Sequence, residues 1–448
     1  MKKFFMALLF IVVWLVPRQT FANTLPIQEV ISPHGIKAWL VYDNKLPLIA
    51  IRFAFRGGVE QDPADKQGLA ELTTSLLTEG AGPYDAEAFQ QKLADESILL
   101  GISAERDVLS GTLKTLRSTR SSAFSLLRLA LTEPRFDPDA IERARRQQQT
   151  AIRFQLGKPE WQARQALFAA IFHDHPYAMR RLGTTATLAN ITRDDIKAFA
   201  GQHIARDNLL IAVTGDMAPE ELAKELDNVF DGLPAHAQLT PIADVAWPEK
   251  TATILIPREG TQTEMLFASP LLKRDDPDWY AADIVNYILG GGGLTSRLMR
   301  DVRDRKGMTY SIGTGLAPMD HTSMLMGNAA TDNAKAGEAW ELMQQVWRDL
   351  YAKGVSEDDL TAAKDYLTGS LPLAMTSTDA IAGVLLGIQL DRFGIDYLDR
   401  RNALIRQVSM DDVNRVIRRW FNPSHLTLSL AGNPEGLKPT TTKEAAEE

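Results

Sequence analysis

A helix followed by a strand occurs twice in this sequence, with one constant offset between the copies. Thr192 opens the first copy and Ser409 the second, and each is followed by a pair of aspartates. Both copies have the pattern of an N-capped helix, a short turn and a buried strand, which ends at Gly215 or at Gly432. Because the register has no gap and each copy closes one half of the chain, we infer duplication rather than chance convergence.

Strand-like and helical segments alternate in no regular order along the rest of the chain. Alternating apolar residues predict a strand at 49–55, and an apolar run predicts a buried strand at 209–213. Apolar residues at helical spacing predict helices at 67–78, 138–153 and 160–171. Irregular alternation is typical of α+β layers. We therefore expect two similar tandem domains, each a mostly antiparallel sheet packed with helices.

Changes in composition set the expected domain boundaries. Residues 232–248 contain proline and alanine without periodicity and are the expected linker. This places an N-terminal domain at 23–231 and a C-terminal domain at 249–433. Residues 434–448 are rich in Thr, Lys, Glu and Ala, have little to bury, and are predicted to be disordered. Opening and closing about the linker is the expected route for substrate entry.

The first 22 residues have the order of a secretory signal peptide. Lys2 and Lys3 precede an apolar run, and Ala22 supplies a small residue at the expected cleavage site. An uncleaved N-terminal anchor is the alternative interpretation. In either case we expect export from the cytoplasm, into the periplasm. No later segment approaches about 18 consecutive apolar residues, so no membrane span is expected after signal cleavage.

The composition excludes several kinds of partner and site. The formal net charge is −8, and an acidic protein repels polyphosphate, which argues against nucleic acid as the main partner. The chain has no cysteine, so disulfides and thiolate metal sites are excluded. Stability must therefore come from packing.

Four consecutive glycines, Gly290, Gly291, Gly292 and Gly293, follow an apolar segment in the second half. A phosphate-binding loop is excluded, because the Gly-Lys-Ser/Thr ending is absent and no strand precedes the glycines. The run indicates a hinge or a place where the backbone approaches another group closely. A plain flexible loop is the alternative.

A basic stretch after these glycines ends in a distinctive pair. Arg303 lies seven residues before Tyr310, and a strand-like segment, 311–315, follows. The order of glycine-rich turn, Ser-Arg-Leu, arginine, tyrosine and strand resembles the second-domain signature of the pitrilysin/insulinase family of zinc metallopeptidases. In that family the matching arginine and tyrosine bind the substrate backbone and help stabilise the reacting carbonyl at a zinc site on the opposing domain. The resemblance implies this substrate-binding role for Arg303 and Tyr310, and their side chains are suitable donors to an oxyanion.

The family's zinc motif is degenerate in the first half. Active members place H-x-x-E-H on a helix, with two histidines on zinc and the glutamate as base. Residues 68–80 fit the flanking pattern, but Glu71, Thr74 and Ser75 stand where histidine, glutamate and histidine are expected. The third ligand in the family is a glutamate on a later helix, and Ala151 occupies that position. We therefore expect no metal site in this chain and interpret Glu71 as a solvated helix carboxylate.

One histidine pair could suggest a different metal site. His173 and His175 lie in the segment 172–177, which resembles the family's His-Pro-Tyr segment, where the role is structural. A metal site here would need a third and fourth ligand with supporting contacts, and the sequence indicates none.

The resemblance implies a non-catalytic, substrate-binding subunit of a heteromeric zinc peptidase. In two-chain members one chain carries the zinc helix, the other contributes the arginine and tyrosine, and the two close like a clamshell around a chamber that admits unstructured peptides. We expect a homologous partner subunit with an intact H-x-x-E-H motif to hold the zinc, and this chain to be inactive alone. The alternatives are a peptide-binding or scaffold protein without a hydrolytic role, and a peptidase active alone through an unusual site.

Overall fold

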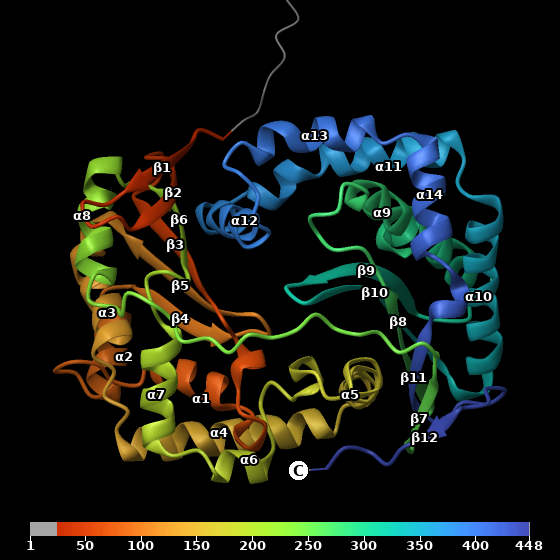
Figure 1. Ribbon diagram of the computed structural model, residues 1–448, viewed down its shortest axis with the longest axis horizontal. Helices are drawn as coiled ribbons and strands as arrows, with labels where there is room; N and C mark the ends of the chain where they lie inside the picture. The colour runs from red at the N-terminus through yellow and green to blue at the C-terminus, as the bar shows by residue number, and fades with distance from the viewer. Residues whose placement is uncertain (1–24, 448) are drawn as a thin grey trace, which may run out of the picture.

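Two six-stranded sheets, one from each half of the chain, face each other across the molecule (Figure 1). The computed structural model describes residues 25–447, so the predicted signal peptide, 1–22, lies outside the described residues. The first sheet has the order β1-β2-β6-β3-β5-β4 and the second β12-β7-β11-β8-β10-β9. The strands of the first sheet are β1 (Ile27–Ile31), β2 (Lys37–Tyr42), β3 (Leu48–Arg56), β4 (Leu99–Ala104), β5 (Val108–Leu116) and β6 (Leu209–Gly215). Those of the second are β7 (Thr253–Pro257), β8 (Gln262–Pro270), β9 (Ser311–Met319), β10 (Thr322–Asp332), β11 (Thr427–Gly432) and β12 (Thr441–Thr442).

The two sheets share one plan, which confirms the predicted α+β fold of two similar domains. In each sheet the strand of the repeated unit lies third: β6 runs parallel to β2 and antiparallel to β3, and β11 runs parallel to β7 and antiparallel to β8. The helices before these strands start at matching capping boxes, in which Thr192 and Ser409 each pair with an aspartate three residues later. The repeat seen in the sequence therefore builds equivalent structure in both halves.

Helices cover both faces of each sheet. The first half contributes α1 (Leu69–Leu76), α2 (Ala86–Asp95), α3 (Arg120–Thr132), α4 (Pro138–Leu156), α5 (Pro159–Phe172), α6 (Thr185–Ala189), α7 (Arg193–His203) and α8 (Pro219–Phe230). The second half contributes α9 (Trp279–Asn286), α10 (Ala336–Lys353), α11 (Glu357–Gly369), α12 (Thr378–Leu390), α13 (Tyr397–Gln407) and α14 (Met410–Trp420). The predicted helices at 67–78, 138–153 and 160–171 correspond to α1, α4 and α5. Between residues 25 and 447 no helix has both the length and the apolar character needed to cross a bilayer.

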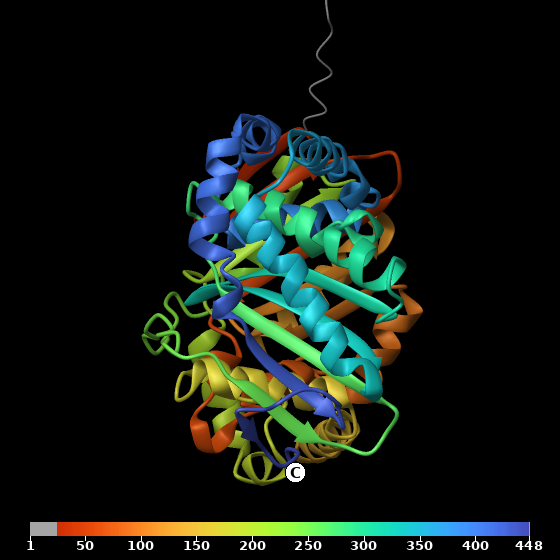
Figure 2. The same ribbon diagram turned by 90° about the vertical axis from the view of Figure 1, so that its right-hand side faces the viewer.

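The inner face of each sheet is covered by a helix from the opposite half (Figure 1). Helix α5 of the first half packs on β7, β8 and β11, whereas α12 of the second half packs on β2, β3 and β6. The outer face of the second sheet carries its own helices, including α10 and α14 (Figure 2). Each half therefore contributes one helix that covers the inner face of the other half's sheet.

This exchange buries two apolar clusters between the halves. In one, Leu385 and Leu386 of α12 pack with Trp39 and Ala54 of the first sheet. In the other, residues of α5 pack with Ile254, Ile256, Leu266 and Ala431 of the second sheet. The segment between α8 and β7, residues 231–252, forms neither helix nor strand. Rotation of the halves about this segment would expose both clusters to water, so the expected opening about the linker conflicts with the packing.

The end of the chain differs from the sequence-based expectation. Residues 434–448 are predicted to be disordered, yet Thr441 and Thr442 form β12, which pairs in parallel with β7. In the first sheet the equivalent outer place is taken by β1, which pairs with β2 in antiparallel orientation. Main-chain pairing with the edge of β7 orders the tail although its side chains have little to bury.

A polar seam also joins the halves, between the β4–β5 turn and the β9–β10 turn. The Tyr177 hydroxyl donates to the Asp107 carboxylate and accepts from the main-chain N–H of His321 at 3.1 Å. The main-chain N–H of Asp320 donates to Asp107 at 3.3 Å, and Arg56 pairs with Asp320 at 3.2 Å. Together these four contacts hold the β4–β5 turn and the β9–β10 turn in register.

The exchange of helices predicts a large stability effect at its centre. Leu385→Ala should lower the free energy of unfolding by about 2–5 kcal/mol, because Leu385 is fully buried and its removal leaves a cavity. Denaturation by urea would measure this loss. Leu373→Ala is the matched control, since Leu373 belongs to the same half and is 73% exposed. Equal losses in the two variants would contradict a structural role for the α12 contact.

A buried carboxylate beside the seam predicts a dependence of stability on pH. Glu60 lies in the 3-10 helix Val59–Gln61, and its carboxylate accepts the main-chain N–H of Gly58. Burial, followed by the nearby charge of Asp107, raises the pKa of Glu60 to about 8. The folded protein therefore holds this proton more tightly than the unfolded chain, whose glutamate pKa is about 4.3. The resulting contribution to stability is complete below that value and is lost as the pH rises to about 8.

Glu60→Gln should remove this contribution. The difference in melting temperature between pH 5 and pH 8 should then be smaller in the variant than in the unchanged protein, because glutamine does not ionise. Glu87→Gln, at an exposed position, should leave the pH profile unchanged. Parallel pH profiles for Glu60→Gln and the unchanged protein would refute the assignment.

Candidate functional site

The degenerate zinc motif lies on α1, whose start is held by a buried aspartate. Asp62 accepts the main-chain N–H of Gly68 at 2.8 Å and that of Ala70 at 2.9 Å. Burial raises the pKa of Asp62 to about 7, although both hydrogen bonds favour the charged form. The apolar side chains of the helix, including Leu72 and Leu76, are buried in the first core. The helix of the motif is therefore built without a metal ion.

The three residues at the motif positions make local contacts. Glu71 pairs with Arg181 at 2.9 Å and is only partly exposed, which corrects its interpretation as a solvated carboxylate. Burial raises the pKa of Glu71, and the charge of Arg181 opposes that effect. The buried Thr74 hydroxyl and the exposed Ser75 hydroxyl both donate to main-chain carbonyls of their own helix. None of the three side chains has the character of a zinc-ligating histidine.

Helix α4 packs against α1, as a third ligand would require, but Ala151 presents only a methyl group there. One turn earlier, the buried amide of Gln148 donates to the main-chain oxygens of Gly68 at 3.1 Å and Leu182 at 3.0 Å. Within residues 25–447 no group of three or more His, Cys, Asp or Glu side chains is placed to hold a metal ion. The residues present at the four motif positions do not fit zinc.

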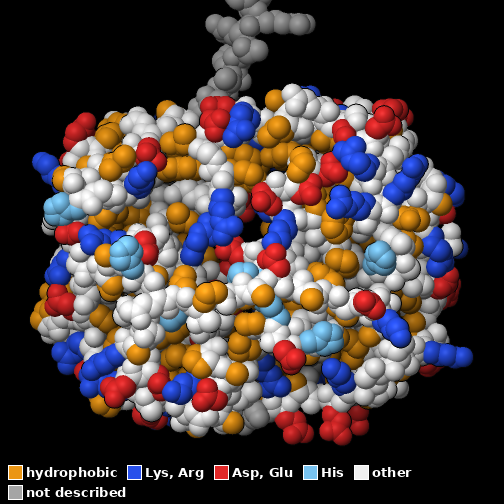
Figure 3. Space-filling view, in the orientation of Figure 1, with side chains coloured by type: hydrophobic (Ala, Val, Ile, Leu, Met, Phe, Trp, Pro, Cys, Tyr) orange, Lys and Arg blue, Asp and Glu red, His pale blue; other side chains and the backbone are white. Residues whose placement is uncertain are grey.

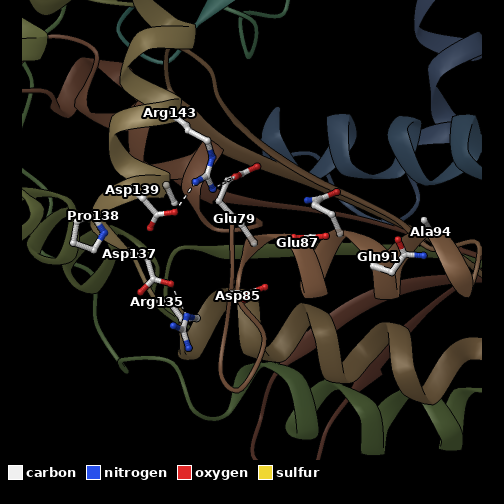
Figure 4. A pocket seen from close by; sticks show the side chains of 13 residues that line it. Glu79, Asp85, Glu87, Gln91, Ala94, Arg135, Asp137, Pro138, Asp139 and Arg143 are labelled. Atoms are coloured by element: carbon white, nitrogen blue, oxygen red, sulfur yellow. Dashed lines mark hydrogen bonds and ion pairs between the residues drawn. The ribbon is translucent and has the colours of Figure 1, made fainter.

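A polar cavity of about 990 Å³ lies just beyond α1, between α2 and the start of α4 (Figure 4). Its charged side chains are largely paired with one another. Arg143 pairs with Asp139 at 2.7 Å and with Glu79 at 3.4 Å, and Arg135 pairs with Asp137 at 2.6 Å. Because these groups are satisfied by surface ion pairs, the cavity lacks the arrangement of an activated base or nucleophile.

The glycine run packs tightly against its neighbours. Gly290 and Gly291 lie in the π-helix Tyr287–Gly291, where a Cβ on Gly290 would come within 2.5 Å of the Thr314 hydroxyl. Gly293 has a φ of +58° and open space around it, which suits a left-handed turn. A close approach was one of the interpretations of the glycine run, and it lies just before the segment that carries Arg303.

Arg303 and Tyr310 are brought together at the surface of the second half. Arg303 lies in the π-helix Met299–Asp304, and its Nε donates to the main-chain oxygen of Tyr310 at 3.0 Å. One terminal nitrogen of Arg303 pairs with Asp304 at 3.0 Å. The Tyr310 side chain is 73% exposed, and its hydroxyl has no hydrogen-bond partner among the described residues. The guanidinium thus positions the chain at Tyr310 while the phenol faces solvent.

The Arg303–Tyr310 pair and the degenerate motif do not form one site within this chain. Helix α1 contacts α4, α7 and β4 in the first half, whereas the helix of Arg303 contacts β9 and α10 in the second. The exchanged helices hold these two environments in fixed positions. The pair and the degenerate motif therefore have separate surroundings in this structure.

His175 has a structural place, in agreement with the implied role of its segment. Its Nδ1 accepts the main-chain N–H of Tyr177 at 3.1 Å, and its Nε2 lies 2.9 Å from the main-chain oxygen of Ala243. Burial lowers the pKa of His175. Because both ring nitrogens contact main chain, His175 attaches the connecting segment to the first half.

A further cavity, of about 670 Å³, lies between the halves and was not foreseen from the sequence. Figure 3 shows a hollow between the halves, at the centre of the face drawn, with basic, acidic and histidine side chains around it. Arg274 in this cavity pairs with Asp391 at 2.9 Å and stacks over the ring of Phe393 at 4.6 Å. In the sequence, the residues that line this cavity stand out only as arginines and aspartates. This composition does not indicate which of them form ion pairs.

Comparison with known proteins agrees with the resemblance found in the motifs. A family model described as "Peptidase M16 inactive domain" matches residues 190–367. The chain is 26% identical over 422 residues to the "Non-peptidase homolog YmxG" of Helicobacter pylori, covering 92% of this chain and 95% of that protein. It is 20% identical to the "Uncharacterized zinc protease YmxG" of Bacillus subtilis, covering 86% of this chain and 96% of that protein.

A solved structure gives the same result. The crystal structure of a peptidase M16 inactive domain from Pseudomonas fluorescens matches with a TM-score of 0.85 and 28% identity, over 93% of this chain and 100% of that chain. Fold, motif positions and sequence identity therefore point the same way. These findings support an inactive member of the peptidase M16 (pitrilysin/insulinase-type) proteins, and the chain lacks the residues of their zinc-binding motif.

Proposed function

We propose that this chain is the non-catalytic, substrate-binding subunit of a heteromeric zinc peptidase that acts on unstructured peptides outside the cytoplasm. One observation carries the proposal: Arg303 and Tyr310 are present together at the surface, whereas the four zinc-motif positions have lost every ligand and the base. The chain therefore retains the arginine and tyrosine that bind substrate in the family, and it lacks the residues that bind the metal.

The geometry of the pair suits a substrate carbonyl. Arg303 uses its Nε and one terminal nitrogen within the chain, and its other terminal nitrogen has no partner among the described residues. The free hydroxyl of Tyr310 is a second donor at the same surface. A partner's zinc would polarise the scissile carbonyl and activate water. Arg303 and Tyr310 would hold the peptide backbone and donate to the oxygen that becomes negative.

Two observations support the proposal of a second chain. The positions on α1 and α4 supply no ligand, and the exchange of α5 and α12 prevents Arg303 from approaching α1. The name of the Helicobacter pylori relative, a non-peptidase homolog, is in keeping with a subunit that does not hydrolyse peptides alone. The partner we propose is a homologous chain with an intact H-x-x-E-H motif.

The proposed location rests on the amino-terminal sequence. Residues 1–22 have the pattern of an export signal, and we infer a periplasmic protein after cleavage. The zinc-bearing partner would have to share that compartment.

Zinc content and activity of the separate chains test the division of labour. The purified chain should contain no stoichiometric zinc and should not hydrolyse quenched-fluorescence peptides, because it has neither ligands nor base. Hydrolysis should increase when the homologous H-x-x-E-H chain from the same source is added, relative to that partner alone. Stoichiometric zinc together with hydrolysis by this chain alone would overturn the proposal.

Substitutions at the pair test its part in the reaction. In the two-chain complex, Arg303→Ala and Tyr310→Phe should each lower kcat/KM by about 10²–10³-fold, because each removes a donor to the developing oxyanion. Arg305→Ala is the matched control, since Arg305 lies on the same surface but pairs with Asp301 at 2.8 Å. Full activity of both test variants would identify a scaffold subunit instead.

A further inference from the structure

The tail of the chain, residues 438–447, lies in a groove between α5 and β7, which we call the tail groove. The main-chain N–H of Thr440 donates to the oxygen of Thr253 at 2.8 Å, and that of Lys443 donates to the oxygen of Leu255 at 2.9 Å. The tail therefore adds a parallel strand to the edge of the second sheet. This is the geometry by which extended peptides join exposed sheet edges.

A buried glutamine on the other wall of the groove binds the same segment. Gln162 of α5 is 2% exposed, and its amide Nε2 donates to the main-chain oxygen of Ala446 at 3.0 Å. Its Oε1 accepts the main-chain N–H of Ala446 at 2.6 Å. One amide thus makes both bonds that a neighbouring strand would make. Arg180 adds a bond to the main-chain oxygen of Glu447 at 2.7 Å.

The Thr440 hydroxyl accepts the main-chain N–H of Thr253 at 2.9 Å and donates to its oxygen at 3.1 Å, and the other contacts named above are made to the main chain of the tail. The side chains of residues 441–444 are exposed, and Ala445 packs beside the apolar cluster of α5. The groove therefore places no restriction on the side chains of residues 441–444, and it requires small side chains near 445 and 446. Backbone recognition of this kind accepts many sequences.

The groove also has space beyond the tail. A cavity of about 500 Å³ is lined on one side by Lys443, Glu444 and Ala446 and on the other by residues that include Gln162 and His173. Strand β12 has only two residues, and few apolar contacts hold it. Segments of this type open at low free-energy cost.

We propose that the tail groove is a peptide-binding site that the chain's own tail occupies, and that an extended peptide from another protein binds there in its place. The ligand is the main chain of an unstructured segment with small residues opposite Gln162. This inference does not depend on Arg303 or Tyr310, which lie elsewhere in the second half. The attached tail competes at a high effective concentration, so peptides bind well only when it is displaced.

Binding of a synthetic peptide to a shortened chain tests the proposal. The chain is ended after Leu437, and a fluorescein-labelled peptide with the sequence of residues 438–448 is titrated and followed by fluorescence anisotropy. We expect saturable binding to the shortened chain and binding at least about tenfold weaker to the full-length chain, whose tail competes. The same peptide with residues 441–444 all changed to serine should bind equally well, because the groove contacts only their main chain.

Gln162 provides the decisive variant. Gln162→Leu in the shortened chain should weaken binding by about tenfold or more, because both hydrogen bonds to the peptide are lost. Gln165→Leu is the matched control, since Gln165 lies on the same helix, lines the same cavity and makes no hydrogen bond to the tail among the described residues. A peptide with proline at the position of Ala446 should also bind weakly, because proline has no N–H to donate.

Two further outcomes are informative. If circular dichroism shows that the shortened chain does not fold, the full-length variant Ala446→Pro replaces it and should bind the labelled peptide more tightly than the unchanged chain. Absence of binding to a folded chain with a released tail, or equal binding by Gln162→Leu and Gln165→Leu, would overturn the proposal. A full-length dimer that the shortened chain does not form would assign the groove to the tail of a second copy, and would also overturn it.

Discussion

The exchange of α5 and α12 between the halves is the contact on which the rest of the structure depends. All six residues of β11 are buried, and β6 is buried through most of its length, so both faces must be covered at the centre of each sheet. Each half covers one face with its own helices and leaves the other face apolar. Burying that second face against a helix of the other half stabilises both at once, which makes the two halves one structural unit.

The sequence predicted the parts of this arrangement that depend on local pattern. The capping residues Thr192 and Ser409, the apolar run at 209–213 and the helical spacing of α5 are short-range signals, and the structure agrees with each. The sheet on which each helix packs could not be predicted in this way. The apolar sides of α5 and α12 predict that they are buried, but they do not indicate which sheet buries them. A linker in the middle of the chain suggests two independent bodies, whereas the exchange joins them.

The two errors at the level of single segments have the same cause. The polar composition of the tail predicted disorder, and the charge of Glu71 predicted exposure. Both predictions considered only how much apolar side-chain surface could be buried. The tail is ordered through its main chain, by the edge of β7 and by Gln162, and neither contact leaves a trace in composition. Glu71 is held by Arg181, which lies far along the chain. Arg303 and Tyr310 were assigned from the spacing of the family motif, and their role in substrate binding stays a prediction.

Loss of the zinc ligands did not require loss of the fold. Helix α1 is fixed by Leu72 and Leu76 in the core and by the Asp62 carboxylate at its start, and none of these residues would touch a metal ion. Replacement of the ligands therefore removes catalytic chemistry at little structural cost. Arg303 is held differently, because its guanidinium binds the main chain of Tyr310 and so contributes to the shape of its own surface. The changed positions therefore lie on a helix that folds without them, whereas Arg303 also has a structural contact.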